Sequence, residues 1–317
     1  MSKRLLVVGS INLDLVAVAP RIPHAGETIS GTSFNTFPGG KGANQAYAAA
    51  RLGASVSMIG KLGNDAFGTE LRANLESAGV NTRAVSVVPT SSGIAQITTA
   101  ANGENVIVVV PGANGDVFPA DLDRHLDVIR SSSIILAQLE IPLETVVHLG
   151  RLAQREGIPL VLDPAPARPL PSSLLHSVTW LTPNESETCA LLGLPSKELP
   201  LDRLEESAEA LLHGGCQNVI LKLGDRGCYL ALATGLRELV PAYKVTAVDT
   251  TAAGDAFNGA FAASLIQGND PVDSARWACA VAAVSVTRPG AQPSMPTQAE
   301  VQEFLDSRAE AANAERR

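Results

Sequence analysis

The sequence Asp249-Thr-Thr-Ala-Ala-Gly-Asp-Ala-Phe-Asn258 follows a short apolar run, residues 245–248, and leads into a longer one, residues 256–266. We expect a strand and a helix, joined by a turn of small residues that lets a ligand approach the backbone. The free N–H groups at the start of such a helix, with roughly half a positive charge from its dipole, form an anion site. Asp255 adds a carboxylate beside this site, which indicates phosphoryl transfer to a hydroxyl group. The alternative is a simple helix cap, because Asp is common at N-cap positions.

The composition favours one large α/β domain with a modest appendage. The chain has 317 residues, of which 45% are hydrophobic and only 4% are aromatic. This length exceeds that of a small domain, and the low aromatic content fits a parallel sheet of aliphatic residues. The net charge of −8 argues against a nucleic-acid partner.

The cysteines and the first residues predict a cytoplasmic protein. The four cysteines show no paired spacing and are expected to be reduced thiols. The apolar run near the N-terminus follows Lys3 and Arg4. It is too short for a signal-peptide core or a membrane span and suits a first strand. We therefore expect no membrane partner.

Short apolar runs alternate with helical stretches along most of the chain. This alternation predicts βαβ units, and hence a central, mostly parallel β-sheet flanked by helices on both faces. The expected strands are residues 5–9, 55–59, 134–139, 160–163, 180–181, 219–223 and 228–233. The expected helices are residues 42–52, 66–78, 119–129, 143–156, 185–192, 204–213, 255–267, 271–287 and 297–307.

Two segments, residues 16–37 and 93–110, interrupt the alternation and predict a small β lid. The first carries Pro and Gly with no helical period, and the second reads as two strands joined by Asn102-Gly103, a strong hairpin signal. We expect the lid to stand over the carboxyl ends of the main strands, where open α/β sheets bind ligands. The predicted main domain comprises residues 1–15, 38–92 and 111–306. Residues 307–317 form the predicted tail.

The predicted lid also indicates a homodimer. Ile94, Ile97, Val106, Val108 and Val110 give it apolar side chains but little core of its own. Isolated small sheets are marginally stable in water, and exposed apolar patches mark interfaces. We expect the lids of two chains to pack together symmetrically.

Residues 38–46 read Pro-Gly-Gly-Lys-Gly-Ala-Asn-Gln-Ala, a flexible backbone in which Lys41 and Asn44 supply hydrogen-bond donors. The spacing is not that of a P-loop.

Asn12 and Asp14 lie two residues apart, so on a strand they share one face. A carboxylate that accepts from two hydroxyls, beside an amide that fixes direction, suits a polyol. The alternative for residues 38–46 is an ordinary glycine turn. The alternative for Asn12 and Asp14 is an Asx turn.

Residues 38–46 and 249–258 resemble, in the right order, the two signatures of the ribokinase-like (PfkB) sugar kinases. The resemblance extends from about residue 5 to about residue 305. It implies phosphorylation of D-ribose at O5 by ATP, with Mg²⁺ and an activating K⁺. Alternatives within the family are kinases of deoxyribose, fructose or a nucleoside. A non-catalytic sugar sensor on the same fold is an alternative of another class.

The resemblance also implies roles for individual residues. The backbone at Ala252, Ala253 and Gly254 would form an anion hole, and Asp255 would be the catalytic base. The implied sugar-binding residues are Asn12, Asp14, Gly40, Lys41, Asn44, Glu140 and Asp255. The implied nucleotide-binding residues are Asn184, Lys222, Gly224, Asp225, Gly227, Gly254 and Cys279. The implied potassium site comprises Asp249, Thr251, Ser285, Arg288, Gly290 and Ser294, and the implied magnesium shell includes Glu187.

Asn184 and Glu187 also fit the first turn of an ordinary helix, because acidic residues there complement the dipole. Asp163 stands where many members of the family carry Asn. Its extra negative charge near the phosphates favours a hydrated magnesium ion.

Overall fold

The central sheet is built around β1 (Arg4–Val8), whose residues alternate between two cores. Leu5 and Val7 pack into one core and Leu6 and Val8 into the other, because successive side chains of a strand point to opposite faces. The computed structural model describes residues 3–314 and places nine strands in this sheet, in the order β13-β12-β11-β10-β9-β8-β1-β4-β5. The other strands are β4 (Ser55–Gly63), β5 (Asn81–Val88), β8 (Ile134–Ala137), β9 (Leu160–Leu162), β10 (Trp180–Leu181), β11 (Asn218–Lys222), β12 (Cys228–Leu232) and β13 (Arg237–Val240).

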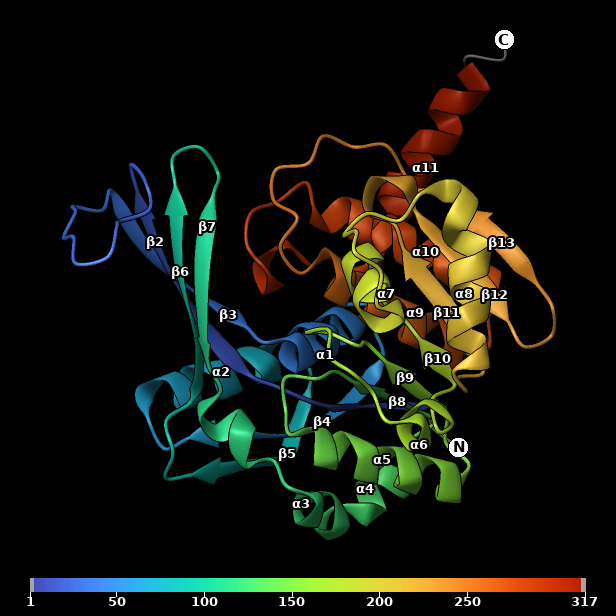
Figure 1. Ribbon diagram of the computed structural model, residues 1–317, viewed down its shortest axis with the longest axis horizontal. Helices are drawn as coiled ribbons and strands as arrows, with labels where there is room; N and C mark the ends of the chain where they lie inside the picture. Colours follow the sequence, from blue (N-terminus) through green and yellow to red (C-terminus); the bar gives the residue numbers. More distant parts are fainter. Residues whose placement is uncertain (1–2, 315–317) are drawn as a thin grey trace.

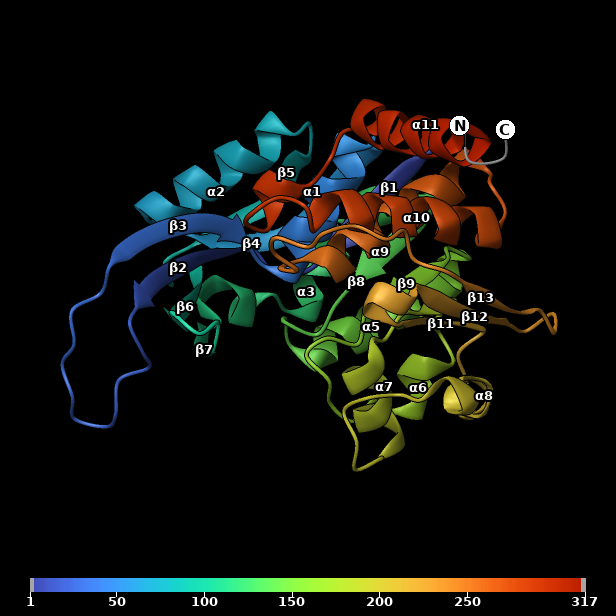
Figure 2. The same cartoon turned by 90° about the horizontal axis from the view of Figure 1, so that it is seen from above.

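Helices cover both faces of this sheet (Figures 1 and 2). One face carries α1 (Lys41–Arg51), α2 (Ala66–Ser77), α9 (Ala253–Gln267), α10 (Pro271–Ser285) and α11 (Gln298–Ala314). The other carries α3 (Pro119–Arg124), α4 (Leu126–Arg130), α5 (Leu143–Glu156), α6 (Ser172–Leu175), α7 (Glu185–Leu192) and α8 (Leu204–His213). The strands pair in parallel except where β12 meets β11 and β13. The predicted α/β class, with a mostly parallel sheet between helices, is confirmed.

A second sheet of four strands stands apart from the first (Figure 1). Its order is β3-β2-β6-β7, with β2 parallel to β6 and the outer pairs antiparallel. The strands are β2 (Asn12–Ala19), β3 (Ser33–Gly39), β6 (Gly93–Ala100) and β7 (Asn105–Val110). Asn102 and Gly103 form the turn between β6 and β7, as predicted. We call this second sheet the lid.

Several predicted elements differ from the structure. The strand expected at residues 245–248 is wrong: the chain is irregular there, and Val248 is 65% exposed. The strands β5 and β13, at the two edges of the central sheet, were not predicted because they lack the long apolar runs of buried strands. The helix expected at residues 119–129 is interrupted at His125 and forms α3 and α4.

The C-terminal helix is longer than expected. The pattern predicted an end at residue 307, but α11 continues to Ala314. Residues 315–317 of the predicted tail lie outside the described residues. Within residues 3–314, no helix is long and apolar enough to cross a membrane.

Candidate active site

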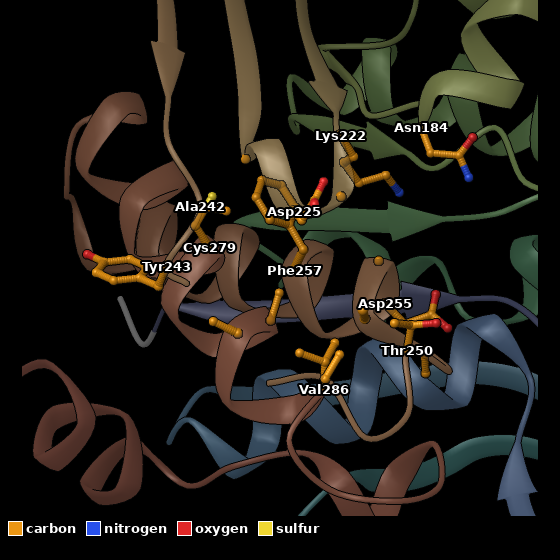
Figure 3. Close-up of a pocket in the computed structure, with 18 of the residues that line it drawn as sticks. Asn184, Lys222, Asp225, Ala242, Tyr243, Thr250, Asp255, Phe257, Cys279 and Val286 are labelled. Atoms are coloured by element: carbon orange, nitrogen blue, oxygen red, sulfur yellow. The ribbon is translucent and has the colours of Figure 1, made fainter. Parts of the chain in front are cut away.

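A large cleft opens beside the carboxyl ends of the central parallel strands. Its volume is about 720 Å³, and its walls come from the ends of β9, β10 and β11, the start of α9 and one face of α10. Figure 3 shows Asn184, Lys222 and Asp255 toward one end and Tyr243 and Cys279 toward the other. The first end is charged, whereas the second is mostly apolar. The cleft thus suits an elongated ligand with one charged end.

The helix α9 begins at the charged end without a side-chain cap. Its N-cap residue, Ala252, has φ 58°, and it is the one non-glycine residue of positive φ in the described part of the chain. This conformation strains an alanine and points to function. Ala252, Ala253 and Gly254 line the cleft, where the N–H groups of the first turn have no intrahelical acceptor, although that of Ala253 donates to the carbonyl of Thr250 at 3.3 Å. The capping alternative is wrong for Asp255, which is the third residue of α9.

Lysine side chains strengthen this anion site. A Cβ atom added to Gly254 would lie 3.4 Å from Nζ of Lys222, so the ammonium group is close to the start of α9. Lys41 lines the same end of the cleft. Burial disfavours its charge, but the surrounding carboxylates, Asp255 foremost, raise its pKa. Both lysines are therefore positioned to face an anion.

The carboxylate of Asp255 is buried and held at both oxygens. Asn44 donates from Nδ2 to Oδ2 at 3.0 Å, and Gln45 donates from Nε2 to Oδ1 at 3.0 Å. Burial raises the pKa of Asp255 to about 6, with Lys41 opposing this shift and Asp163 adding to it. A carboxyl group with this pKa is ionised near neutral pH and can still accept a proton.

Gln45 links Asp255 to a second carboxylate. Its Nε2 also donates to Oδ2 of Asp163 at 2.9 Å, and Lys222 donates to the other oxygen of Asp163 at 2.9 Å. Gln138 donates to Oε1 of Gln45 at 2.6 Å and thereby fixes the direction of the Gln45 amide. Sequence reasoning missed Gln45 and Gln138, because an isolated glutamine carries no recognisable spacing.

The lid strand β2 carries Asn12 and Asp14 next to Gly39 and Gly40, which directly precede α1. Asn12 accepts at Oδ1 from Nδ2 of Asn114 at 2.7 Å, and this bond fixes the direction of the Asn12 amide. A Cβ atom at Gly39 would lie 2.5 Å from Oδ2 of Asp14, so only glycine leaves room for this carboxylate. Asn114 was also missed by sequence reasoning, since it lies in a short 3-10 turn (Gly112–Asp116).

Acidic groups surround Asp14. Burial, Glu140 and Asp255 raise its pKa to about 7. Glu140 accepts at Oε2 from Oγ of Ser10 at 2.6 Å and from the backbone N–H of Lys41 at 3.0 Å. Gly40 precedes Lys41 with φ 84° and packs against the backbone of Ile11 and Asn12. The predicted sugar residues therefore lie in one connected region around α1 and β2.

The predicted nucleotide residues line the large cleft. These are Asn184, Lys222, Gly224, Asp225, Gly227, Gly254 and Cys279. Asn184 also caps α7, accepting from the N–H of Glu187 at 2.9 Å, while Glu187 accepts from the N–H of Asn184 at 2.7 Å. Glu187 lines the cleft too, and burial raises its pKa. The capping geometry and a place in the site are thus both present.

The predicted potassium residues make three different kinds of contact. Asp249 joins two loops, accepting from the N–H of Thr251 at 2.9 Å and from the N–H of Gly290 at 2.8 Å. Arg288 instead pairs with Glu300 of α11 at 2.8 Å.

The two serines of that set use their hydroxyls locally. Ser285 and Ser294 each donate to the carbonyl three residues earlier, at 2.8 and 2.7 Å. In the described residues, no cluster of three His, Cys, Asp or Glu side chains could hold a metal ion. A cation here would therefore depend on backbone carbonyls and on few carboxylates.

An anion site with lysines and a buried carboxylate beside it, on this fold, defines a phosphoryl-transfer enzyme. The chain belongs to the pfkB family of carbohydrate kinases, whose model matches residues 2–298. It is 43% identical over 304 residues to the ribokinase of Bacillus subtilis, covering 96% of this chain and 99% of that one. It is 40% identical over 301 residues to the deoxyribokinase of Salmonella typhi, covering 94% and 97%.

Solved structures agree with this assignment. The structure of Arabidopsis thaliana ribokinase complexed with ribose and ATP has a TM-score of 0.90 at 34% identity and covers 96% of this chain and 99% of that one. The ribokinase of Thermotoga maritima has a TM-score of 0.87 at 38% identity, covering 95% and 99%.

Proposed function

We propose that the protein transfers the γ-phosphoryl group of ATP to the O5 hydroxyl of D-ribose. The observation that carries the proposal is the buried carboxylate of Asp255, held by two amides at the uncapped start of α9. The similarity to ribokinases, one of them solved with ribose and ATP, supports the choice of substrates.

In this proposal Asp255 takes the proton of the sugar hydroxyl as the hydroxyl oxygen attacks the γ-phosphorus. The bond from the γ-phosphorus to the bridging oxygen of ATP breaks, and ADP leaves with that oxygen. The backbone at Ala252, Ala253 and Gly254 and the ammonium of Lys222 stabilise the charge that develops on the transferred group. Asn12, Asp14, Lys41, Asn44 and Glu140 hold the sugar hydroxyls.

The residues predicted to bind the nucleotide bind ATP in the large cleft. The phosphates lie near Asn184 and Lys222, and the adenine base lies at the apolar end of the cleft near Cys279.

We also propose two cations. Mg²⁺ prefers oxygen ligands and one or two carboxylates, and Asp163 and Glu187 at the phosphate end meet that requirement. When bound, it supplies charge neutralisation of the phosphates. The loops joined by Asp249 would hold K⁺ through backbone carbonyls, and that ion would brace the start of α9.

The lid is proposed to close the sugar site and to form a dimer contact. Along β7, residues 106–110 are 43–55% exposed although all are apolar. Covering such a strand with its copy removes both the apolar surface and the free edge. The four cysteines are unpaired, which fits the reducing cytoplasm.

A coupled assay of ADP release with a panel of sugars tests the function. Ribose is expected to give the highest kcat/KM, above deoxyribose, fructose and nucleosides. Preference for deoxyribose would reassign the substrate within the family, as the similarity to a deoxyribokinase allows. Binding of sugar without any turnover would instead support a sugar sensor and overturn the proposal.

A further inference from the structure

A segment without helix or strand, residues 241–248, leads from β13 toward α9 and forms one wall of the cleft at its apolar end. We call this segment the strap. Ala242 and Tyr243 of the strap lie in the cleft wall near Cys279 (Figure 3). The strap is a part of the cleft wall that belongs to neither the sheet nor the helices.

The two ends of the strap are fixed by the backbone. At its start, a Cβ atom at Gly227 would lie 2.0 Å from the carbonyl of Val240 and 2.6 Å from the N–H of Ala242, so the chain packs directly on this glycine. At its end, Val248 donates to the carbonyl of Val286 at 2.7 Å. Within residues 3–314, no backbone group of another segment bonds to the middle of the strap.

Arg308 of α11 supplies the missing contact. Its Nη2 donates to the carbonyl of Lys244, and within residues 3–314 this is the one hydrogen bond that reaches residues 241–247. The Arg308 guanidinium carbon lies 4.5 Å from the ring centroid of Phe304 and 5.9 Å from that of Tyr243. The two rings meet edge to face at 5.7 Å. Cation–π and aromatic contacts of this kind restrict a ring to one orientation.

Arg308 lies outside the part of the chain that the family model describes. It lies ten residues beyond residue 298, where the match to the family model ends. Its role is therefore not contained in the family signatures, which concern the opposite end of the cleft.

We propose that Arg308 is a positioning residue for the base of the bound nucleotide. It holds the strap and Tyr243 so that the apolar end of the cleft is formed before the nucleotide enters. The inference rests on the proposed nucleotide site. Without Arg308 the strap samples other conformations, and nucleotide binding must order it again, which weakens affinity. The sugar site and the base Asp255 lie at the other end and do not depend on this contact.

The test compares ADP binding by calorimetry in the wild type, Arg308→Met and a control, Arg130→Met. Methionine keeps the apolar stem of the side chain and removes the guanidinium. The control removes another half-exposed arginine, which pairs with Glu156 far from the strap. We expect the dissociation constant for ADP to rise roughly three- to tenfold in Arg308→Met, the range of one net hydrogen bond. We expect the ADP dissociation constant of the control to equal that of the wild type. In Arg308→Met, KM for ribose and kcat should stay unchanged.

Each outcome bears on one proposal. Unchanged ADP affinity in Arg308→Met, in an enzyme that phosphorylates ribose, overturns the role of Arg308 alone. An equal loss of ADP and ribose affinity, with a lower melting temperature, shows a general structural role and also overturns it. A wild type that neither binds ADP nor turns over ribose removes the proposed function itself. A further variant, Tyr243→Leu, should raise the ADP dissociation constant similarly, and adding Arg308→Met to it should have little further effect.

Discussion

The amide of Gln45 donates to Oδ1 of Asp255 at 3.0 Å. Together with the bond from Asn44 to Oδ2, this gives each oxygen of a 5%-exposed carboxylate one neutral donor. Hydrogen bonds to the charged form favour ionisation, whereas burial opposes it. The balance leaves the group charged near neutral pH yet basic enough to take a proton.

Replacing this base tests the mechanism directly. Asp255→Asn should fold and bind both substrates, because the amide has a similar size and its oxygen still accepts one of the two hydrogen bonds. It cannot accept the proton, so kcat should fall by roughly 10² to 10⁴. Steady-state kinetics measure the loss, and Asp123→Asn, at an exposed aspartate next to His148, is the control. A kcat within a few-fold of wild type would show that Asp255 is not the base.

The pH dependence of activity should follow the ionisation of Asp255. Its pKa is raised to about 6, so the active, ionised form is present above pH 6 and is lost as the pH falls through that value. The charge of Lys41 lowers this pKa. Lys41→Met should therefore move the acidic limb of kcat to higher pH, whatever its effect on the maximal rate. A limb that stays in place or moves to lower pH would contradict the assignment.

Removing the carboxylate of the lid strand should affect one substrate only. At pH 8, above the pKa of about 7 for Asp14, Asp14→Ala should weaken ribose binding by about 1.5–3 kcal/mol, the contribution of a charged hydrogen-bonding partner. ATP affinity should stay nearly constant, because Asp14 lies on β2 and does not line the large cleft. Calorimetry with each ligand measures both values. Equal ribose affinity in the variant and the wild type would remove Asp14 from the sugar site.

Potassium should stimulate the enzyme. Asp249 joins the loops that begin α9 and follow α10, and hydrogen bonds from Thr251 and Gly290 lower its pKa despite partial burial. At fixed ionic strength, replacing tetramethylammonium by potassium should raise kcat. Asp249→Ala disconnects the two loops and should weaken this response. A wild-type rate that is the same in both salts would remove the cation from the proposal without affecting the kinase reaction.

The lid should hold two chains together. Light scattering at micromolar concentration should give about twice the chain mass of 32.9 kDa. Val108→Lys, at the middle of β7 and 55% exposed in the single chain, should shift the mass toward one chain. Leu201→Lys, at a 54%-exposed position outside the lid, should leave it unchanged. A fully active wild-type monomer would show that the lid is stable alone.

The sequence predicted buried, regular elements best. Helix α7 begins and ends where expected, because Asn184 caps its start and Gly193, with φ 67°, ends it. The strand expected at residues 245–248 fails for a physical reason, since an apolar run without a neighbouring strand has no partner for its backbone. Asp255 and Asn44 were recognisable from their signatures. The hydrogen bonds of Gln45 and Asn114 were not recognisable from the sequence, because they join residues that are more than 90 positions apart.

Strand β2 has a mechanical consequence. It is paired on both sides, with β3 and β6, and its first residue is Asn12, so the sugar-facing end and the distal end of the lid belong to one stiff rod. Eight residues of strand make this rod about 26 Å long. If Asp14 binds a sugar hydroxyl as proposed, a small rotation of the lid at its base would produce a larger displacement at its far end. A reporter dye placed near Phe34 would thus read the occupancy of a site that it never touches.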